Sequence, residues 1–297
     1  MNMRETFLAT TEEVLGADAR VAVVLADISA ASLTHAAERH PSRVINVGIR
    51  EQLLVSVGGG LALAGMRPIV HTFSSFLVER AFEQIKLDLN HQDVGAVLVS
   101  YGASYDMPTA GRTHQAPGDV ELIGSLPGWT VHVPGNGEEA RRLLLESIPG
   151  DDRVYLRLSA QENAQAHLGA GFQTLRQGSR GVVLAVGPML DRVLAATEGR
   201  DVTVLYTSTI RPFDAAGLLA AVRTTGTADV VLVEPYLAGT SAHQVAEALA
   251  DVPHRLRSLG VRRESEVRSY GEIADHDLAH GLDAGSIALS VKEFLGI

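Results

Sequence analysis

Residues 46–64 read NVGIREQLLVSVGGGLALA, and the fold is most readily inferred from this stretch. Apolar side chains recur at helical spacing over residues 51–64, so we expect a helix there. The glycines 58–60 lie inside this helix, where they allow close packing against its neighbours. They do not stand between a strand and a helix, which disfavours a Rossmann dinucleotide-binding turn.

Short apolar, β-branched runs alternate with helical patterns on both sides of this stretch. In the first half we expect strands at 21–27, 66–73, 94–101, 129–134 and 154–159, and further helices at 75–89 and 138–147. In the second half we expect strands at 181–187, 201–208 and 228–235, and helices at 189–198, 213–224, 241–251 and 286–296. Continuous apolar strands are typical of parallel sheets covered on both faces. The predicted fold class is therefore α/β, with two domains, each a mostly parallel sheet flanked by helices.

The length of 297 residues fits two domains. We place the first domain at 1–165 and the second at 181–297. The stretch 166–180 between them is polar, contains glycine and shows no strong period, so we interpret it as a linker.

Composition disfavours several classes of protein. The 35 acidic residues outnumber the 25 Lys and Arg, and the net charge of −10 disfavours a nucleic-acid partner. Cysteine is absent, which excludes disulfides and thiolate chemistry and favours the cytoplasm. No apolar run reaches the roughly 18 residues of a membrane helix. The N-terminus lacks a signal-peptide pattern, and the scattered histidines predict no metal site.

Glu51 is the residue whose surroundings most suggest chemistry. It stands at the start of a helix, among apolar neighbours, so we expect it to be partly desolvated. A carboxyl group in such a place can stay protonated and donate a hydrogen bond. An acidic residue in the first helical turn also stabilises the helix dipole, and the position alone does not decide between these roles.

Three longer motifs follow in order: NVGIREQ at 46–52, HTFSSFLVERAFEQI at 71–85 and GRTHQAPGDVELIGSLPGWTVHVPGNGEEA at 111–140. Together with VYLRLS at 154–159 and VLVEPYLAGTSAHQVAEAL at 231–249, they resemble the C-terminal half of the transketolase family. That half consists of a pyrimidine-binding domain and a transketolase C-terminal domain. The resemblance implies thiamine diphosphate as the cofactor.

The resemblance also implies roles for individual residues. Glu51 matches the glutamate that hydrogen-bonds the aminopyrimidine and so helps to remove the proton from the thiazolium carbon. Phe73 and Phe76 match aromatics that contact the pyrimidine, and Phe76 is the better match for stacking. His114 matches a histidine that reaches the substrate, and Asp27 matches an acid near the cofactor. From the residues alone, the phenylalanines fit core packing and Asp27 fits a helix cap.

Half of a transketolase has no counterpart in this sequence. Full-length relatives carry a G-D-G motif and a later Asn that hold Mg²⁺ and the diphosphate, and no G-D-G occurs here. The resemblance therefore implies the small subunit of a split enzyme, and RAFEQI at 80–85 is similar to split members. We expect a larger pyrophosphate-binding subunit that holds the Mg²⁺. We also expect an α2β2 heterotetramer that is active only with both subunits.

The expected sugar-phosphate site is incomplete. Transketolases commonly carry Arg, His, Asp and Ser where this chain has Ala160, Gly102, Ala110 and Ala31. Arg4 matches the remaining phosphate-binding arginine. Arg112 either replaces a lost cation at the substrate or is a solvated loop residue. We therefore expect transfer of a two-carbon ketol unit with a non-standard donor or acceptor, such as an unphosphorylated sugar, a cyclitol precursor or a carrier-tethered acceptor.

Three alternatives stay open. The β subunit of a 2-oxoacid dehydrogenase decarboxylating component has the same two domains and cofactor glutamate, although the THQ motif favours a transketolase. A deoxyxylulose-phosphate synthase is closely related, but its fused N-terminal half has no counterpart here. The incomplete substrate site also fits a non-catalytic scaffold or regulatory subunit, against which the joint presence of Glu51, Phe76 and His114 argues.

Overall fold

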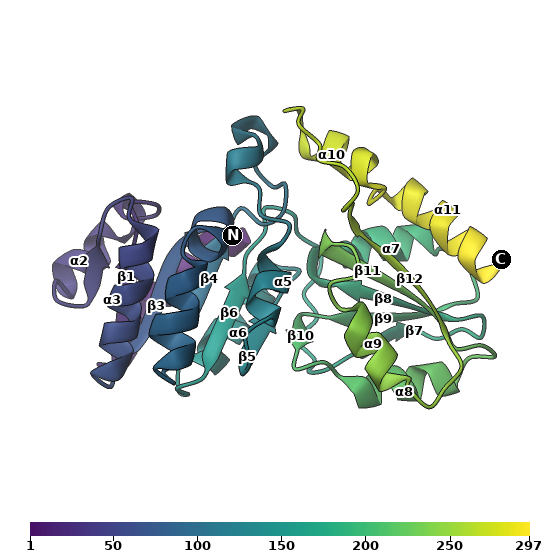
Figure 1. The fold of residues 1–297 in the computed structure, drawn as a ribbon, viewed down its shortest axis with the longest axis horizontal. Coiled ribbons are helices and arrows are strands. Elements are labelled where there is room, and N and C mark those ends of the chain that lie inside the picture. Colours follow the sequence, from purple (N-terminus) through teal and green to yellow (C-terminus); the bar gives the residue numbers. More distant parts are fainter.

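The structure, a computed structural model, describes residues 1–297 and contains two β-sheets side by side, each flanked by helices (Figure 1). The first sheet has the strand order β10-β5-β6-β4-β3-β1-β2, and its neighbours are parallel except at β10. Its strands are β1 (Val21–Leu25), β2 (Val44–Asn46), β3 (Arg67–Phe73), β4 (Val97–Tyr101), β5 (Trp129–His132), β6 (Arg153–Arg157) and β10 (Thr209–Arg211).

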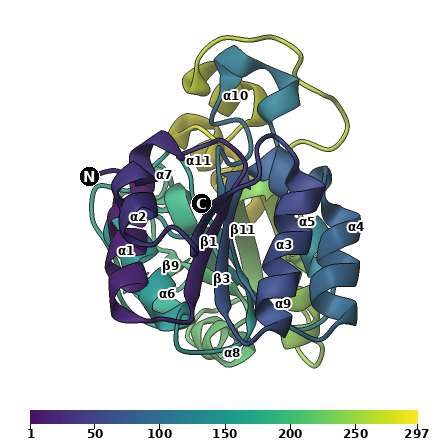
Figure 2. The ribbon, with the colours of Figure 1, turned by 90° about the vertical axis from the view of Figure 1, so that its left-hand side faces the viewer.

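Both faces of the first sheet are covered because its strands are apolar on both sides. β1 is buried along its whole length. Its Val23 packs in the apolar cluster that includes α1 and α6, and its Val24 in the cluster that includes α3. Figure 2 shows α1, α2 and α6 on one face and α3, α4 and α5 on the other. These helices are α1 (Met3–Ala17), α2 (Thr34–Arg39), α3 (Glu51–Leu63), α4 (Phe82–Gln84), α5 (Asp119–Gly124) and α6 (Gly137–Ser147).

Helix α3 packs closely against its neighbours through its glycines, as the sequence predicts. A Cβ atom at Gly58 would lie 2.6 Å from Cγ2 of Val70 in β3. A Cβ atom at Gly59 would lie 2.7 Å from the carbonyl oxygen of Asp88. A larger residue at either position would push α3 outward. The two glycines therefore help to set where α3 lies, and with it Glu51 at its start.

The second sheet has the strand order β12-β11-β8-β9-β7, with β7 antiparallel to β9 and the other neighbours parallel. Its strands are β7 (Gln173–Arg176), β8 (Val182–Val186), β9 (Thr203–Thr207), β11 (Asp229–Leu237) and β12 (Arg255–Val261). The helices of this half are α7 (Leu190–Ala196), α8 (Ala215–Arg223), α9 (Ala242–Ala248), α10 (Ile273–His280) and α11 (Ala284–Leu295). α7 and α11 pack on one face, and α8 and α9 on the other. This arrangement confirms the predicted α/β fold class.

The predicted helix at 75–89 is present but is not uniformly α-helical. π-Helical turns at Ser75–Glu79 and Ile85–His91 flank α4. Such turns are uncommon and occur frequently at functional sites. Short 3-10 helices lie at Ala31–Leu33, Pro108–Ala110, Arg112–His114 and Gly187–Met189. None of the helices is both long enough and apolar enough to span a membrane.

The two halves of the chain are tied together at their junction. β10 comes from the second half but pairs antiparallel with β5 at the edge of the first sheet. β7 lies inside 166–180, the stretch interpreted as a linker, and forms the edge of the second sheet. One apolar cluster runs across the junction, from Val131 and Ile210 to Leu232. The division into domains at 1–165 and 181–297 stays a prediction.

Candidate functional site

The carboxyl ends of four parallel strands carry most of the predicted site residues. Asp27 follows β1, Glu51 follows β2, Phe73 ends β3 and Tyr101 ends β4. The carboxyl ends of parallel strands meet at one edge of a sheet, which is where open α/β sheets bind ligands. The topology thus brings together residues that lie far apart in the sequence.

Glu51 is buried in the first turn of α3, with 1% of its surface exposed. The chain reaches it through Gly48, whose φ of 72° lies in the left-handed region that favours glycine. Oε2 of Glu51 accepts a 2.6 Å hydrogen bond from Nη1 of Arg80, and the two groups form an ion pair. The burial agrees with the sequence-based expectation. The partner differs from it, because the carboxyl group faces a guanidinium group and not only apolar neighbours.

Three rings gather around this ion pair. Phe73 and Phe76 meet edge to face with centroids 5.9 Å apart. The ring of His114 lies 5.0 Å from that of Phe76 and 5.5 Å from that of Phe73. Cζ of Arg80 lies 4.1 Å from the centroid of Phe76, four residues earlier on the same helical segment. The structure therefore brings Glu51, Phe73, Phe76 and His114 to one place.

The members of this cluster differ in their access to solvent. The side chain of Glu51 is 2% exposed, whereas that of Arg80 is 39% exposed. Phe76 and His114 are partly exposed. A ligand that displaced Arg80 would meet a ring face at Phe76 and a buried carboxyl group at Glu51. This arrangement suits a flat ring that stacks on one side and hydrogen-bonds at its edge.

A second group of residues lies at the ends of β1 and β2. Oδ1 of Asp27 accepts a 3.0 Å hydrogen bond from Nδ2 of Asn46. Oδ1 of Asn46 accepts hydrogen bonds from the backbone N–H groups of Asp27 and Gly48. Asp27 and Ser29 have φ values of 63° and 64°, conformations that are strained for residues other than glycine and that cluster at functional sites. Asn46 thus ties Asp27 to the turn that leads to Glu51.

Arg4 reaches the same edge from α1 and ends a chain of polar contacts. Its Nη2 donates to Oγ of Ser29 at 3.1 Å, and this Oγ lies 3.0 Å from Nε2 of His71. Nδ1 of His71 lies 2.8 Å from the carbonyl oxygen of Val99, which can only accept. Burial lowers the pKa of His71 to about 4, so its ring is neutral at pH 7, with the proton on Nδ1. Ser29 therefore donates to His71 and accepts from Arg4. Cζ of Arg4 also lies 5.2 Å from the ring centroid of Tyr101.

Arg112 shares a one-turn helix with His114 but contacts the second half of the chain. Its Nε donates to Oε1 of Glu266 at 2.5 Å, and its Nη1 donates to the carbonyl oxygen of Gln115 at 2.8 Å. The bond from Arg112 lowers the pKa of Glu266. The hydrogen bonds of Arg112 go to Glu266 and Gln115 and not to the residues around Glu51, and its role at the substrate stays a prediction.

Other groups of the chain fill part of the incomplete sugar-phosphate site. The backbone N–H of Ala160 donates to Oδ2 of Asp106 at 2.8 Å, and Oδ1 of Asp106 accepts from Ser159 at 3.0 Å. Burial raises the pKa of Asp106. Gly102 has a φ of 74°, and a Cβ atom there would lie 3.1 Å from Sδ of Met107. An internal acid therefore contacts the backbone of Ala160, the residue that stands in place of the phosphate-binding arginine implied by the resemblance.

Three further residues belong to this edge although the sequence assigns them no role: Asn46, His71 and Arg80. Each lies within a motif that carries the resemblance, in NVGIREQ, HTF and RAFEQI, and that position is the only sequence signal for them. Nowhere in the structure do three or more histidine or acidic side chains gather in a way that could hold a metal ion.

Known proteins are similar to this chain in sequence and architecture. Residues 1–165 match the model of the transketolase pyrimidine-binding domain. A protein of Rhodococcoides fascians, described as an uncharacterized 33.6 kDa protein in the fasciation locus, is 60% identical over 99% of this chain and 95% of its own length. The 6-deoxy-6-sulfo-D-fructose transketolase subunit SqwH of Clostridium sp. strain MSTE9 is 30% identical over 88% of this chain and 84% of its own length. A solved split-gene transketolase, described as an inactive β4 tetramer, is 25% identical. It matches 100% of this chain and 99% of its own with a TM-score of 0.87.

Proposed function

The chain belongs to the transketolase family, and we propose that it is the small subunit of a split, thiamine-diphosphate-dependent transketolase-like enzyme. The reaction is the transfer of a two-carbon ketol unit between sugar-like substrates, with a non-standard donor or acceptor. One observation carries the proposal: at the carboxyl edge of a parallel sheet, one guanidinium group, that of Arg80, contacts both the buried carboxyl group of Glu51 and the partly exposed ring of Phe76.

The residues at this edge fit the aminopyrimidine of thiamine diphosphate. Arg80 shows which kind of group fits between Glu51 and Phe76. Its planar guanidinium group lies over the ring of Phe76 and donates a hydrogen bond to Glu51. A pyrimidine ring has the same two requirements, a ring face for stacking and a carboxyl group for a ring nitrogen. Phe73 would support the stacked ring from the side, and Asp27 would stand at the next strand end.

The bound cofactor would supply a nucleophilic carbon and an electron sink. Glu51 would orient the pyrimidine and hold a proton at its ring nitrogen. His114, beside Phe76, would exchange a proton with a substrate hydroxyl group. Arg4 would contact the substrate from the rim of the site, and Arg112 is the second predicted substrate contact.

A larger subunit would complete the site by holding the diphosphate and Mg²⁺. The surface next to Glu51 supports such a partner, because Ile49 and Leu53, within two residues of Glu51, are 69% and 44% exposed. Large exposed apolar side chains that gather in one region mark protein contacts. We propose an α2β2 heterotetramer in the cytoplasm, with this surface between subunits. The related split-gene chain is described as an inactive β4 tetramer, and we expect the present chain to be inactive alone.

Reconstitution tests the proposal. The chain is combined with a candidate larger subunit that carries a G-D-G motif and a later Asn. Thiamine diphosphate with Mg²⁺ is then titrated calorimetrically into the pair and into each subunit. We expect binding and ketol transfer only in the pair. Cofactor binding without ketol transfer by the pair, or no binding at all, would favour a scaffold or regulatory role.

The substrates decide between related activities. Decarboxylation of pyruvate with a lipoyl acceptor would indicate the β subunit of a 2-oxoacid dehydrogenase component. Ordinary turnover of xylulose 5-phosphate and ribose 5-phosphate by the pair would contradict the altered substrate while leaving the chemistry intact.

A further inference from the structure

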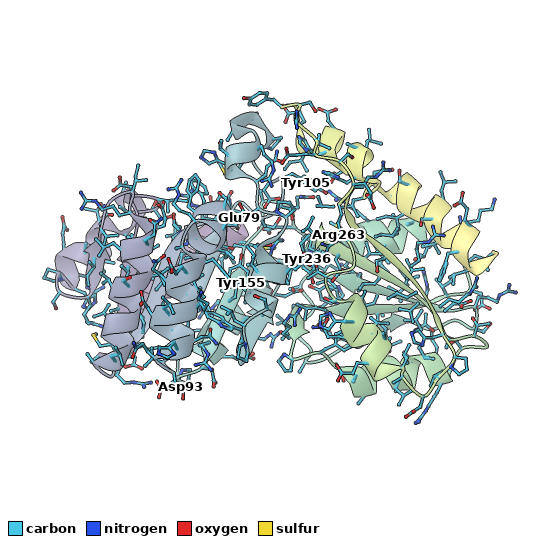
Figure 3. All side chains as sticks on the ribbon, viewed as in Figure 1. Glu79, Asp93, Tyr105, Tyr155, Tyr236 and Arg263 are labelled. Carbon is cyan, nitrogen blue, oxygen red and sulfur yellow. The ribbon has the colours of Figure 1, made fainter.

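A polar cavity lies at the junction of the two halves, outside the cluster of Glu51, Phe73, Phe76 and His114. Its volume is about 260 Å³, and it lies between the loop that follows β4 and the segment that follows β12. These two segments lie next to each other at the top of Figures 1 and 2, and Figure 3 labels Arg263 near the junction. Six of its lining residues are polar or charged groups that bear on its chemistry: Arg112, Gln115, Arg262, Arg263, Glu266 and His280.

Several donors that line this cavity have no acceptor within the chain, among them the exposed guanidinium group of Arg262 and the buried amide of Gln115. The backbone N–H of Arg262 contacts Nδ1 of His280 at 3.4 Å, but its guanidinium group makes no hydrogen bond or ion pair within the chain. Gln115 is 6% exposed, and its Nε2 has no hydrogen-bond partner. Burial lowers the pKa of His280 to about 4, so its ring is neutral at pH 7. Because Nδ1 of this ring accepts, the proton is on Nε2, which is a further donor.

The cavity is positively charged although the whole chain carries −10. Three arginines and one carboxylate line it. That carboxylate, Glu266, pairs with Arg112 at 2.5 Å, and Arg263 pairs with Glu121 at 2.9 Å. Of the three arginines that line the cavity, Arg262 is therefore the one that forms no ion pair with an acidic side chain.

We propose that this cavity binds the phosphate group of a small molecule. Arg262 forms the charge-assisted hydrogen bonds to it, and Gln115 and His280 donate neutral ones. Donors from three separate positions suit a tetrahedral group better than a planar carboxylate. The cavity is larger than one phosphate group and leaves room for part of the molecule that carries it.

The cavity lies on the other side of a single helical turn from the candidate active site. Arg112 lines the cavity, His114 contacts the ring of Phe76, and both belong to the 3-10 helix Arg112–His114. Such a helix rises only about 2 Å per residue. The cavity would therefore anchor the charged end of an extended substrate, since Ala160 stands in place of the phosphate-binding arginine that the resemblance implies and an acid, Asp106, lies beside it. This last step rests on the proposed function, whereas phosphate binding does not.

Calorimetric titration of the full chain with sodium phosphate at constant ionic strength tests the binding. We expect saturable binding at one site, with weaker binding of sodium acetate. Ribose 5-phosphate binds more tightly than inorganic phosphate if the cavity also takes the molecule that carries the group. Equal affinities would restrict the site to the free anion.

Two substitutions that should change the affinity for phosphate in opposite directions make the test specific. Arg262→Gln should weaken phosphate binding roughly tenfold, because it removes a charge-assisted hydrogen bond. Arg39→Gln, at an exposed arginine in the last turn of α2, is the matched control and should change nothing. Glu266→Gln should tighten binding several-fold, because it removes the lining carboxylate and frees Arg112. Absence of saturable binding, or equal effects of Arg262→Gln and Arg39→Gln, would overturn the proposal.

Failure of this inference is distinguishable from failure of the proposed function. Arg262→Gln should leave the affinity of the reconstituted pair for thiamine diphosphate unchanged, since Arg262 lies outside the Glu51 site. Phosphate binding without cofactor binding would leave an anion site in a protein of another function. Cofactor binding without phosphate binding would overturn the cavity proposal alone.

Discussion

Two arginine–carboxylate pairs in this chain are built alike but lie in different surroundings. Arg80 pairs with Glu51 at 2.6 Å, and Arg157 pairs with Asp119 at 2.7 Å. Each arginine also lies over an aromatic ring. Arg80 is 39% exposed, whereas Arg157 and Asp119 are 1% and 0% exposed. The comparison indicates that solvent access of the arginine separates two kinds of ion pair. A buried arginine forms a permanent structural pair, whereas a partly exposed arginine forms a pair that a ligand can displace.

The buried pair of Arg157 and Asp119 belongs to a hydrogen-bond network that links the two sheets. Oδ2 of Asp119 also accepts from Tyr155 at 2.7 Å, and Arg157 also donates to Oγ of Ser104 at 2.6 Å. That Oγ donates to the carbonyl oxygen of Pro235 in β11, so β6 of the first sheet is linked to the second. Figure 3 shows Tyr155 in the first half and Tyr236, over which Arg157 lies, close to the junction. The side chain of Arg80, by contrast, hydrogen-bonds only Glu51.

The largest expected effect is the loss of the buried pair. Asp119→Asn leaves the charge of Arg157 buried without a counter-charge, which should lower the free energy of unfolding by about 3–5 kcal/mol. Urea unfolding followed by circular dichroism measures this loss. The matched control is Asp93→Asn, which breaks an ion pair between Arg153 and an 88% exposed acid and should cost at most about 1 kcal/mol. Equal effects of the two substitutions would remove the distinction between the pairs.

Glu51→Gln should damage function and leave the fold intact. The amide still accepts a hydrogen bond from Arg80, so the urea midpoint should change little. It cannot hold the proton that the proposed role requires, so ketol transfer by the reconstituted pair should fall roughly 100- to 10,000-fold. Exchange of the thiazolium proton of bound thiamine diphosphate, followed by NMR, should slow in parallel. Glu83→Gln, at a nearby exposed acid, is the control. An unfolded Glu51→Gln chain would make this pair a permanent structural pair as well.

Much of the fold is predictable because its strands are buried on both faces. β1 and β8 are apolar and buried along their whole length, so they stand out against the polar segments around them. α1 is harder to detect because its buried face carries threonines among its apolar residues: Thr6, Thr10 and Thr11. β10 is not predictable from local pattern, since this short strand is defined by pairing with β5 from the other half of the chain.

In the candidate site, too, the sequence predicts some features and misses others. Motif position identifies Glu51, Phe76 and His114, and the strand ends bring them together. The ion pairs of Glu51 with Arg80 and of Arg112 with Glu266 depend on side-chain conformation and on how the two halves pack. The spacing of residues along the chain specifies neither ion pair. The sequence alone therefore predicts apolar surroundings for Glu51 and does not decide whether Arg112 contacts the substrate or is a solvated loop residue.

Glu234, on the second-sheet side of the buried network of Arg157 and Asp119, should respond to pH. It is 0% exposed, its Oε2 has no partner, and burial raises its pKa from 4.5 to about 7. Because the folded chain holds this proton more tightly than the unfolded chain, the stabilisation is complete below pH 4.5 and is lost as pH rises through 7.

Glu234→Gln carries no titrating proton, so its stability should not share this loss. Above pH 7 the variant should be more stable than the unsubstituted chain by about 3 kcal/mol, at about 1.4 kcal/mol per pH unit. Urea unfolding between pH 5 and pH 8 measures the difference, with Glu264→Gln at an exposed acid as the control. If the free energy of unfolding depends on pH in the same way in the unsubstituted chain and in Glu234→Gln, then Glu234 does not titrate in this range.

The smallest expected effect tests the displaceable pair most directly. Because Arg80 occupies both the carboxyl group of Glu51 and the face of Phe76, a pyrimidine ring has to displace it. A half-exposed ion pair and a cation–π contact together oppose this by about 1 kcal/mol. Arg80→Gln should therefore tighten thiamine diphosphate binding by the reconstituted pair roughly fivefold, measured calorimetrically beside the exposed control Lys86→Gln. Weaker binding in Arg80→Gln would mean that the guanidinium group stays and contacts the cofactor. The two arginines would then share one role, each holding its acid in place.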